Sequence, residues 1–354
     1  MRFDLSDDQR RLQDAVSDYL AHECPLPTTL AAHEDADADR ALFKGLMGLG
    51  LGGVAIPEAL GGMGLKMLDL AIIAEIVGRF AAPGRFFAHM AAIHAIVISG
   101  DETVQQTWLT RLASGEALAT IALGEGNERW FADEWQLSGE ATLTGSKLFV
   151  PNADEADIIL VGLGGGRLGL VEAHAPGLSI RPANGIDAGR PIFQLDFDET
   201  PFTRLSGDGE RVVDAALVLL TADAFGGATH CVEASIAYAL EREQFGRKIG
   251  AFQALKHQLA DMALEVEPAV GLFWYAAFMF DEESPDATAA IALAKAHITE
   301  IYTDISRRMI EAHGGIGYTW EFAAHVWLKR ALFNRAYLGM PRRHRARYAT
   351  LQRW

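Results

Sequence analysis

The spacing of hydrophobic residues changes near residue 117 and again near residue 209. Before the first change, apolar residues recur at intervals of three and four, which is typical of amphipathic helices. Between the two changes, short β-rich runs are bounded by Gly, Pro, Asn and Asp, which predicts strands. The helical spacing then returns. The pattern predicts an α+β protein with an N-terminal helical domain, a middle β-domain and a C-terminal helical bundle, at residues 1–116, 117–208 and 209–354.

Local signals predict where the N-terminal helices begin and end. Ser6 is a suitable N-cap, and Gln9 completes a capping box for the first helix. Residues 25–38, with several Pro and Asp, predict a loop. Asp101 is the expected cap of the last helix in this segment. The later helices are expected at residues 40–49, 67–80, 86–99 and 102–113.

The middle segment predicts a small antiparallel barrel or sandwich, because many short strands follow one another closely. Residues 162–169, rich in glycine, are expected to form a hairpin turn, since no helix follows that could complete a phosphate loop. The strands are expected at residues 119–123, 135–137, 141–150, 158–161, 168–172, 178–181 and 193–197.

Four long helices with apolar stripes predict a bundle in the last segment. They are expected at residues 213–242, 252–280, 287–311 and 321–338. Gly246 and Gly250 break the chain between the first two helices. Arg242 and Phe245 at this corner suit a bound pyrophosphate, because a guanidinium binds phosphate oxygens well. The alternative is an ordinary solvated turn between helices.

Composition narrows the class of protein. The chain has 354 residues, of which 22% are charged, and a net charge of −16, which argues against nucleic acid as a partner. Two cysteines, Cys24 and Cys231, form no disulfide framework and no zinc motif. The polar N-terminus does not resemble a signal peptide, and no run of about 18 apolar residues predicts a membrane span. A cytoplasmic location is therefore expected.

Three sequence blocks resemble the acyl-CoA dehydrogenase family in order and spacing. They are Arg-Glu-Gln-Phe-Gly-Arg at residues 242–247, Phe-Gln-Ala-Leu-Lys-His-Gln-Leu-Ala-Asp-Met at residues 252–262, and His-Gly-Gly-Ile-Gly-Tyr-Thr-Trp-Glu at residues 313–321. The resemblance implies the family fold, FAD as cofactor, and α,β-dehydrogenation of an acyl-CoA thioester. It also implies an electron-transfer flavoprotein or a similar acceptor as a partner.

The resemblance further implies residues that bind the flavin of a neighbouring subunit. The family's diphosphate-binding positions fall on Arg242, Phe245, Gln253, Gly314 and Gly315. A further position, which carries glutamine in the family, is Glu311 here, and its carboxylate would repel a diphosphate.

The ring-binding and catalytic positions depart from the family pattern. Phe149 could stack on a flavin ring, but Pro151 stands at the threonine position and Gly124 at a hydroxyl position. The two usual places of the catalytic glutamate fall on Leu338 and about Ala216, so neither carries a carboxylate. The resemblance therefore implies a scaffold without its own catalytic base.

These departures resemble bacterial α₂β₂ members of the family that act on sterol and bile-acid side-chain CoA esters, in which a paralogous subunit supplies the base. A homo-oligomer with a relocated base at Asp214 or Asp223 is one alternative, although a helix start or a buried polar group is the simpler reading of both. A scaffold or CoA-ester binding protein without flavin is another, and a flavin oxygenase is a fourth.

Several remaining polar residues are expected to be structural. His313 and His325 lack metal-like neighbours in the sequence, and Glu321 is expected to cap the following helix. A basic cluster at Arg342, Arg343, Arg345 and Arg347 is expected to be a solvated helix end, with contact to a CoA or ADP phosphate as the alternative.

Overall fold

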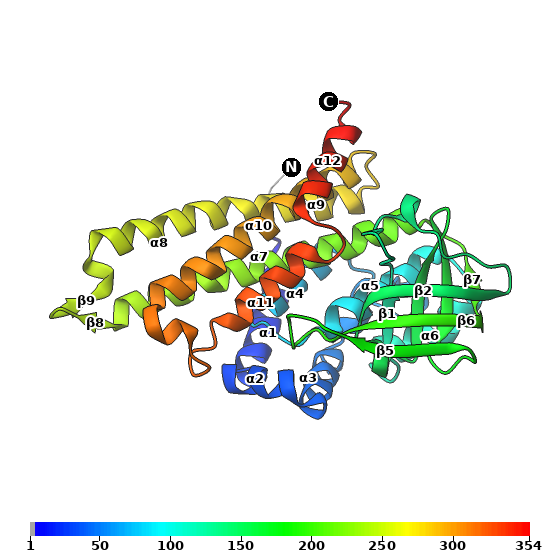
Figure 1. Ribbon diagram of the computed structural model, residues 1–354, viewed down its shortest axis with the longest axis horizontal. Helices are drawn as coiled ribbons and strands as arrows, with labels where there is room; N and C mark the ends of the chain where they lie inside the picture. Colours follow the sequence, from blue (N-terminus) through cyan, green and yellow to red (C-terminus); the bar gives the residue numbers. More distant parts are fainter. Residues whose placement is uncertain (1–3) are drawn as a thin grey trace.

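The computed structural model describes residues 4–354. The molecule is elongated, with the β-sheets at one end and a long helical bundle reaching to the other (Figure 1). The helices before the sheets are α1 (Asp7–Glu23), α2 (Leu26–Glu34), α3 (Ala36–Gly48), α4 (Met67–Arg79), α5 (Arg85–Ser99) and α6 (Glu102–Ala113). The predicted α+β class is confirmed.

Local capping explains the first helices. Ser6 accepts a hydrogen bond from the Gln9 amide and the Gln9 side chain accepts one from the Ser6 amide, so the predicted capping box is present. Asp101 caps α6 through the Val104 amide, as expected. The predicted loop at residues 25–38 is wrong, because this stretch holds α2 and the start of α3. A proline is tolerated in the first turn of a helix, and Asp35 caps α3.

The middle segment forms two sheets from β1 (Ala119–Ala122), β2 (Thr142–Pro151), β3 (Ile158–Leu163), β4 (Arg167–Glu172), β5 (Leu178–Ala183), β6 (Ile192–Pro201) and β7 (Thr203–Leu205). The strand orders are β1-β3-β4-β7 and β2-β6-β5. The pairing is antiparallel except that β1 and β3 run parallel. The strand predicted at residues 135–137 is absent; there the amides of Gln136 and Leu137 donate to the Glu125 carboxylate instead of to a neighbouring strand.

The last segment contains α7 (Gly209–Glu241), α8 (Gln253–Val266), α9 (Val270–Asp281), α10 (Ala287–His313), α11 (His325–Ala336) and α12 (Pro341–Leu351). The helix predicted at residues 252–280 is interrupted by a 3₁₀ turn at Glu267–Ala269, which contains Pro268. Glu321 does not cap α11, whose N-cap is Ala324 without a side-chain cap. A short hairpin of β8 (Glu243–Gln244) and β9 (Arg247–Lys248) joins α7 to α8.

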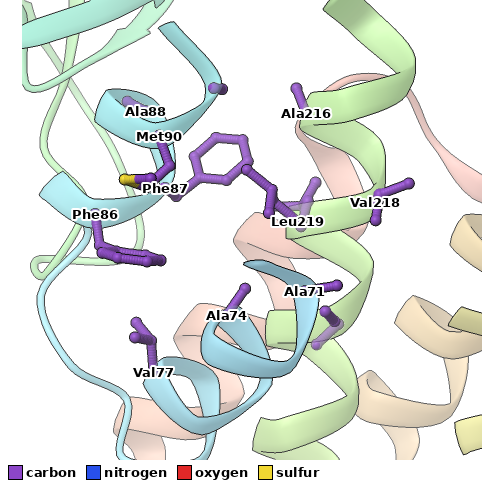
Figure 2. Packing of buried hydrophobic residues seen from close by; sticks show 14 of the residues in the cluster. Ala71, Ala74, Val77, Phe86, Phe87, Ala88, Met90, Ala216, Val218 and Leu219 are labelled. Atoms are coloured by element: carbon purple, nitrogen blue, oxygen red, sulfur yellow. The ribbon is translucent and has the colours of Figure 1, made fainter. Parts of the chain in front are cut away.

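The core lies where α4, α5 and α7 meet (Figure 2). A Cβ atom at Gly226 of α7 would lie 1.8 Å from the Glu75 carbonyl oxygen of α4, so only glycine permits this close approach. Ala216 belongs to the same core and is fully buried. By length and composition α7 and the stretch Gln253–Asp281 could each cross a membrane; 94% of the α7 window is nevertheless buried within the protein, as in an ordinary core helix.

Candidate functional site

The residues expected to contact flavin fall into two groups at opposite ends of the molecule. Arg242 lies at the C-terminal end of α7, beside the β8–β9 hairpin, and Ala216 lies near the start of the same helix (Figure 1). Because an α-helix rises about 1.5 Å per residue, these two positions on α7 lie roughly 40 Å apart. Phe149 lies on β2, in the sheets at the other end from the hairpin. One chain therefore cannot bring both groups to one flavin.

The hairpin end of the bundle presents a guanidinium and a ring to solvent. Arg242 is the C-cap of α7 and its side chain is exposed. Phe245 at the tip is 90% exposed, and its φ of 55° places a bulky residue in the left-handed region. Gln253, the first residue of α8, is also exposed. The positive φ values of Phe245 and Gly246 belong to the two-residue turn between β8 and β9, which leaves the Phe245 ring at the exposed tip.

The Gly314–Gly315 turn lies at the same end. His313, immediately before it, packs its ring 4.4 Å from the Tyr238 ring, one helical turn before Arg242. Gly314 has a φ of 62°, which suits glycine, and both glycines are exposed. Tyr318 and Trp320, just beyond the turn, are 73% and 63% exposed, so aromatic surface surrounds it.

Glu311 is exposed on α10, two residues before His313. It lines an open groove of about 510 Å³ between α8 and α10, together with Glu265 and Arg308. Arg308 donates to Glu265 at 2.9 Å. Arg308 is already paired with Glu265 and Asp304, so its charge does not offset the repulsion expected between Glu311 and a diphosphate.

A second concave site, the aromatic cavity, lies between the sheets and the end of α11. Its volume is about 300 Å³. The rings of Trp130 and Phe149 are nearly parallel, with centroids 5.7 Å apart, and Tyr337 meets the Trp130 ring edge-on at 5.1 Å. Phe149 has a φ of 58°. The lining residues are Glu128, Trp130, Phe149, Asn184, Gly185, Ile186, Ile192, Leu332, Phe333, Ala336, Tyr337 and Met340.

Two positions next to the aromatic cavity lack the polar groups that the resemblance assigns to flavin-ring binding. Pro151 has no N–H, and its carbonyl accepts the buried Thr120 hydroxyl. A Cβ at Gly124 would lie 2.7 Å from the Trp130 ring, so the indole occupies the space of a side chain at that position. At these two positions, therefore, the residues present do not fit the side-chain hydrogen bonds that the resemblance assigns to a flavin ring.

Both positions expected for the catalytic base carry apolar, buried residues. Leu338 is fully buried, with a φ of 58°, and its carbonyl is hydrogen-bonded to His344 at 2.9 Å. Ala216 is part of the α4–α5–α7 core. Glu128 is the one carboxylate in the cavity lining, and it lies at the exposed rim, 3.5 Å from Arg342. The cavity therefore lacks a buried carboxylate that could act as a base.

Asp223 forms the centre of a buried charge cluster, which we call the Asp223 cluster. Arg190 donates to its carboxylate at 2.6 Å, Arg330 at 3.1 Å and Asn334 at 2.7 Å. Burial alone would raise the pKa of Asp223, but the two guanidinium groups lower it to about 2. Such a carboxylate is fully engaged and faces the interior, so it is unsuited to proton abstraction.

Asp214, the other candidate for a relocated base, is not among the residues that line the aromatic cavity. It lies within α7 rather than at the helix start, and it accepts a hydrogen bond from Thr288 of α10 at 2.6 Å. Burial raises the pKa of Asp214 to about 7. Its other carboxylate oxygen has no hydrogen-bond partner. A protonated, structural carboxyl explains both observations.

Asp214→Asn is expected to remove a pH dependence of stability. The folded-state pKa is raised, so wild-type stability is complete below pH ~4 and falls as pH rises through about 7. At pH 8 the variant should be more stable by roughly 4 kcal/mol, because burial raises the pKa from 3.8 to about 7 and each pKa unit corresponds to about 1.4 kcal/mol; at pH 4 it should match wild type. Denaturant unfolding at both pH values measures this. An equal effect at both pH values would contradict the assignment of a neutral carboxyl.

Sequence reasoning did not find Arg190, Arg330 or Lys295 as site-forming residues. Lys295 is fully buried and donates to the carbonyl of Tyr337 at 3.0 Å, which anchors the end of α11. Burial lowers the pKa of Lys295 well below its usual value. A single charged residue on an otherwise apolar helix face is the sequence signal that could have identified such residues. Lys295, which lies among the alanines of α10, is an example.

The other polar candidates are structural. The C-terminal arginines pair with carboxylates: Arg342 with Glu128, Arg343 with Glu134, Arg345 with Glu300, and Arg347 with Glu210. His313 is hydrogen-bonded to the Met309 carbonyl. Cys231 is buried, and burial raises the pKa of its thiol. Across residues 4–354, no group of His, Cys, Asp and Glu could hold a metal ion.

Comparison with known sequences identifies the family of this scaffold. Residues 6–116 match the profile of the acyl-CoA dehydrogenase N-terminal domain, and residues 213–350 match that of the C-terminal domain. The chain is 33% identical over 298 residues to the acyl-CoA dehydrogenase FadE34 of Mycobacterium tuberculosis, covering 84% of this chain but only 40% of FadE34. It is 29% identical to the acyl-CoA dehydrogenase IpdE2 of the same organism, covering 95% of this chain and 94% of IpdE2.

Solved structures agree with the sequence relatives. A steroid ACAD, Tcur3481–Tcur3483, is similar with a TM-score of 0.90 and 29% identity, over 98% of each chain. Butyryl-CoA dehydrogenase from Megasphaera elsdenii shares the fold, with a TM-score of 0.88 and 22% identity over 100% of each chain.

Proposed function

Because the chain belongs to the acyl-CoA dehydrogenase family of FAD-dependent oxidoreductases, we propose that it is one subunit of a heteromeric acyl-CoA dehydrogenase. A paralogous subunit supplies the catalytic base and the flavin-ring site. The single observation that carries the proposal is that the residues lining the aromatic cavity include no buried carboxylate. The hairpin end, in contrast, keeps the residue types that would bind a diphosphate.

The separation of the two groups within one chain supports a flavin that is shared between two subunits. FAD, when bound, accepts the hydride from the β-carbon of the thioester. In this proposal Arg242 donates hydrogen bonds to the diphosphate of a flavin whose ring lies in the partner, and Phe245 shields those bonds from water. The Gly314–Gly315 turn permits close approach, because its glycines carry no side chains and are exposed. Desolvation on assembly would strengthen each of these charged contacts.

The proposal also covers the acyl group of the substrate and the acceptor of the electrons. The steroid ACAD neighbour supports a bulky, sterol-like acyl group rather than a short linear chain. Electrons would pass to an electron-transfer flavoprotein or a similar acceptor. The exposed aromatic surface around Phe245, Tyr318 and Trp320 supports a permanent subunit interface at the hairpin end, since isolated chains rarely leave so much apolar area in water.

Absorbance and native mass test this proposal directly. The chain purified alone is expected to be colourless, whereas coexpression with a paralogous dehydrogenase subunit should give a yellow complex with one FAD for each pair of chains. A yellow protein with one FAD per subunit, obtained without a partner, would overturn the proposal in favour of a homo-oligomer. A colourless complex would favour a scaffold or CoA-ester binding protein.

A further inference from the structure

The C-terminal helix α12 contacts two segments that form walls of the aromatic cavity. One is the turn after α11, where His344 of α12 is hydrogen-bonded to the Leu338 carbonyl at 2.9 Å. The other is the stretch at residues 128–134, which carries Trp130 and which we call the indole segment. The His344 ring meets the Phe131 ring of this segment edge-on, with centroids 5.4 Å apart. One helix therefore touches both walls.

Arginines of α12 hold the indole segment by charge. Arg343 donates hydrogen bonds to the Glu128 carbonyl and to the Glu134 carboxylate, at the two ends of the segment. The Arg347 guanidinium lies over the Phe131 ring, 4.3 Å from its centroid. Both arginine side chains are partly buried, so water screens these contacts less than it screens an ion pair on the open surface.

Glu134 connects Arg343 to the backbone of Trp130. Its carboxylate accepts hydrogen bonds from the amides of Trp130 and Phe131, at 3.0 and 3.2 Å. The same carboxylate is the partner of Arg343, and a charge-assisted hydrogen bond of this kind is stronger than a neutral one. Removing the charge of Arg343 therefore leaves the Glu134 side chain, and with it the backbone of Trp130, without its fixed partner.

The position of the Trp130 indole decides the shape of one side of the cavity. Trp130 is 6% exposed, and a Cβ atom at Gly124 would lie only 2.7 Å from its ring. The indole thus covers the backbone at Gly124. A displacement of the indole segment would uncover Gly124 and enlarge the aromatic cavity on that side.

We propose that α12 is an ionic clamp: its arginines keep the indole segment closed over Gly124, and weakening their ion pairs lets Trp130 leave this position. The Arg342–Glu128 pair at the cavity rim, with side chains 74% and 55% exposed, is the part that salt screens first. The clamp is a property of the single chain, so the inference stands apart from whether a partner subunit supplies the flavin-ring site. Access to the cavity is then set by the charges on α12.

Hydrogen exchange of the full chain, measured by mass spectrometry, tests the clamp. In the double variant Arg343→Gln and Arg347→Gln, peptides that cover the indole segment should exchange roughly tenfold faster than in wild type, because charge-assisted hydrogen bonds to the segment are lost. Arg345→Gln is the matched control, since Arg345 lies on the same helix but is exposed and pairs with Glu300 of α10. Exchange of the indole segment in this control should equal wild type.

Wild type provides a second measurement that needs no variant. Raising NaCl from about 0.01 to 1 M shortens the Debye length from ~30 to ~3 Å, and this should speed exchange in the indole segment while peptides of the buried helix α4 stay unchanged. Unchanged exchange of the segment, in the folded double variant or in wild type at high salt, would overturn the inference and show that burial of Trp130 and Phe131 holds the segment without charge. So would an equal increase in Arg345→Gln. If the double variant fails to fold, the salt series decides alone.

Discussion

Asp223→Asn is expected to destabilise the protein by about 3–5 kcal/mol at neutral pH, because removing one partner of a buried ion pair leaves the others uncompensated. In the folded protein the Asp223 carboxylate accepts hydrogen bonds from Arg190 and Arg330, both buried. Asparagine keeps the size of the side chain but not the negative charge. Two buried guanidinium groups would then repel each other where a carboxylate now holds them together.

Denaturant unfolding at pH 7 measures this effect, and Asp214→Asn gives the contrast, because the same substitution there should raise stability and not lower it. Both aspartates are buried on α7, yet only Asp223 is paired with arginine. The Asp223 pKa is lowered to about 2, so its contribution is present above pH ~4 and is lost as pH falls through 2. The difference between wild type and Asp223→Asn should therefore narrow under acid. A constant difference down to pH 2 would show that the charge is not responsible.

Arg242→Ala is expected to weaken FAD retention by the heteromeric complex roughly 10- to 100-fold, because one charge-assisted set of hydrogen bonds to a diphosphate is lost. The side chain is exposed at the end of α7, so the fold of the isolated chain should not change. Equilibrium dialysis of flavin from the purified complex gives the dissociation constant. The unfolding midpoint of the chain alone should match that of wild type.

Lys44→Ala is the control for charge. Lys44 is an exposed cation on α3, far from α7 in sequence, and its removal changes the net charge by the same amount. Flavin retention should be unchanged in this variant. Equal losses in both variants would indicate a general electrostatic effect, whereas no loss in Arg242→Ala would exclude the hairpin end as a diphosphate site.

A good part of the fold could be predicted from local patterns. The capping box at Ser6 and the cap at Asp101 are present, because such contacts involve residues three apart along the chain. The change from helical to strand spacing of the hydrophobic residues located the β-domain, because this spacing is also a local property of the chain. The prediction failed at residues 25–38, where composition suggested a loop but proline in a first helical turn is compatible with a helix.

Some features of the candidate site could likewise be predicted from the sequence, and others could not. The α+β architecture, the resemblance to the family and the apolar residues at the usual base positions could all be predicted, because residue identity and spacing are enough for each of them. Only the tertiary structure decided that Trp130 covers Gly124 and that Arg190, Asp223 and Arg330 meet. These contacts join residues far apart in the chain, and their charges are tolerated only because packing brings the partners together.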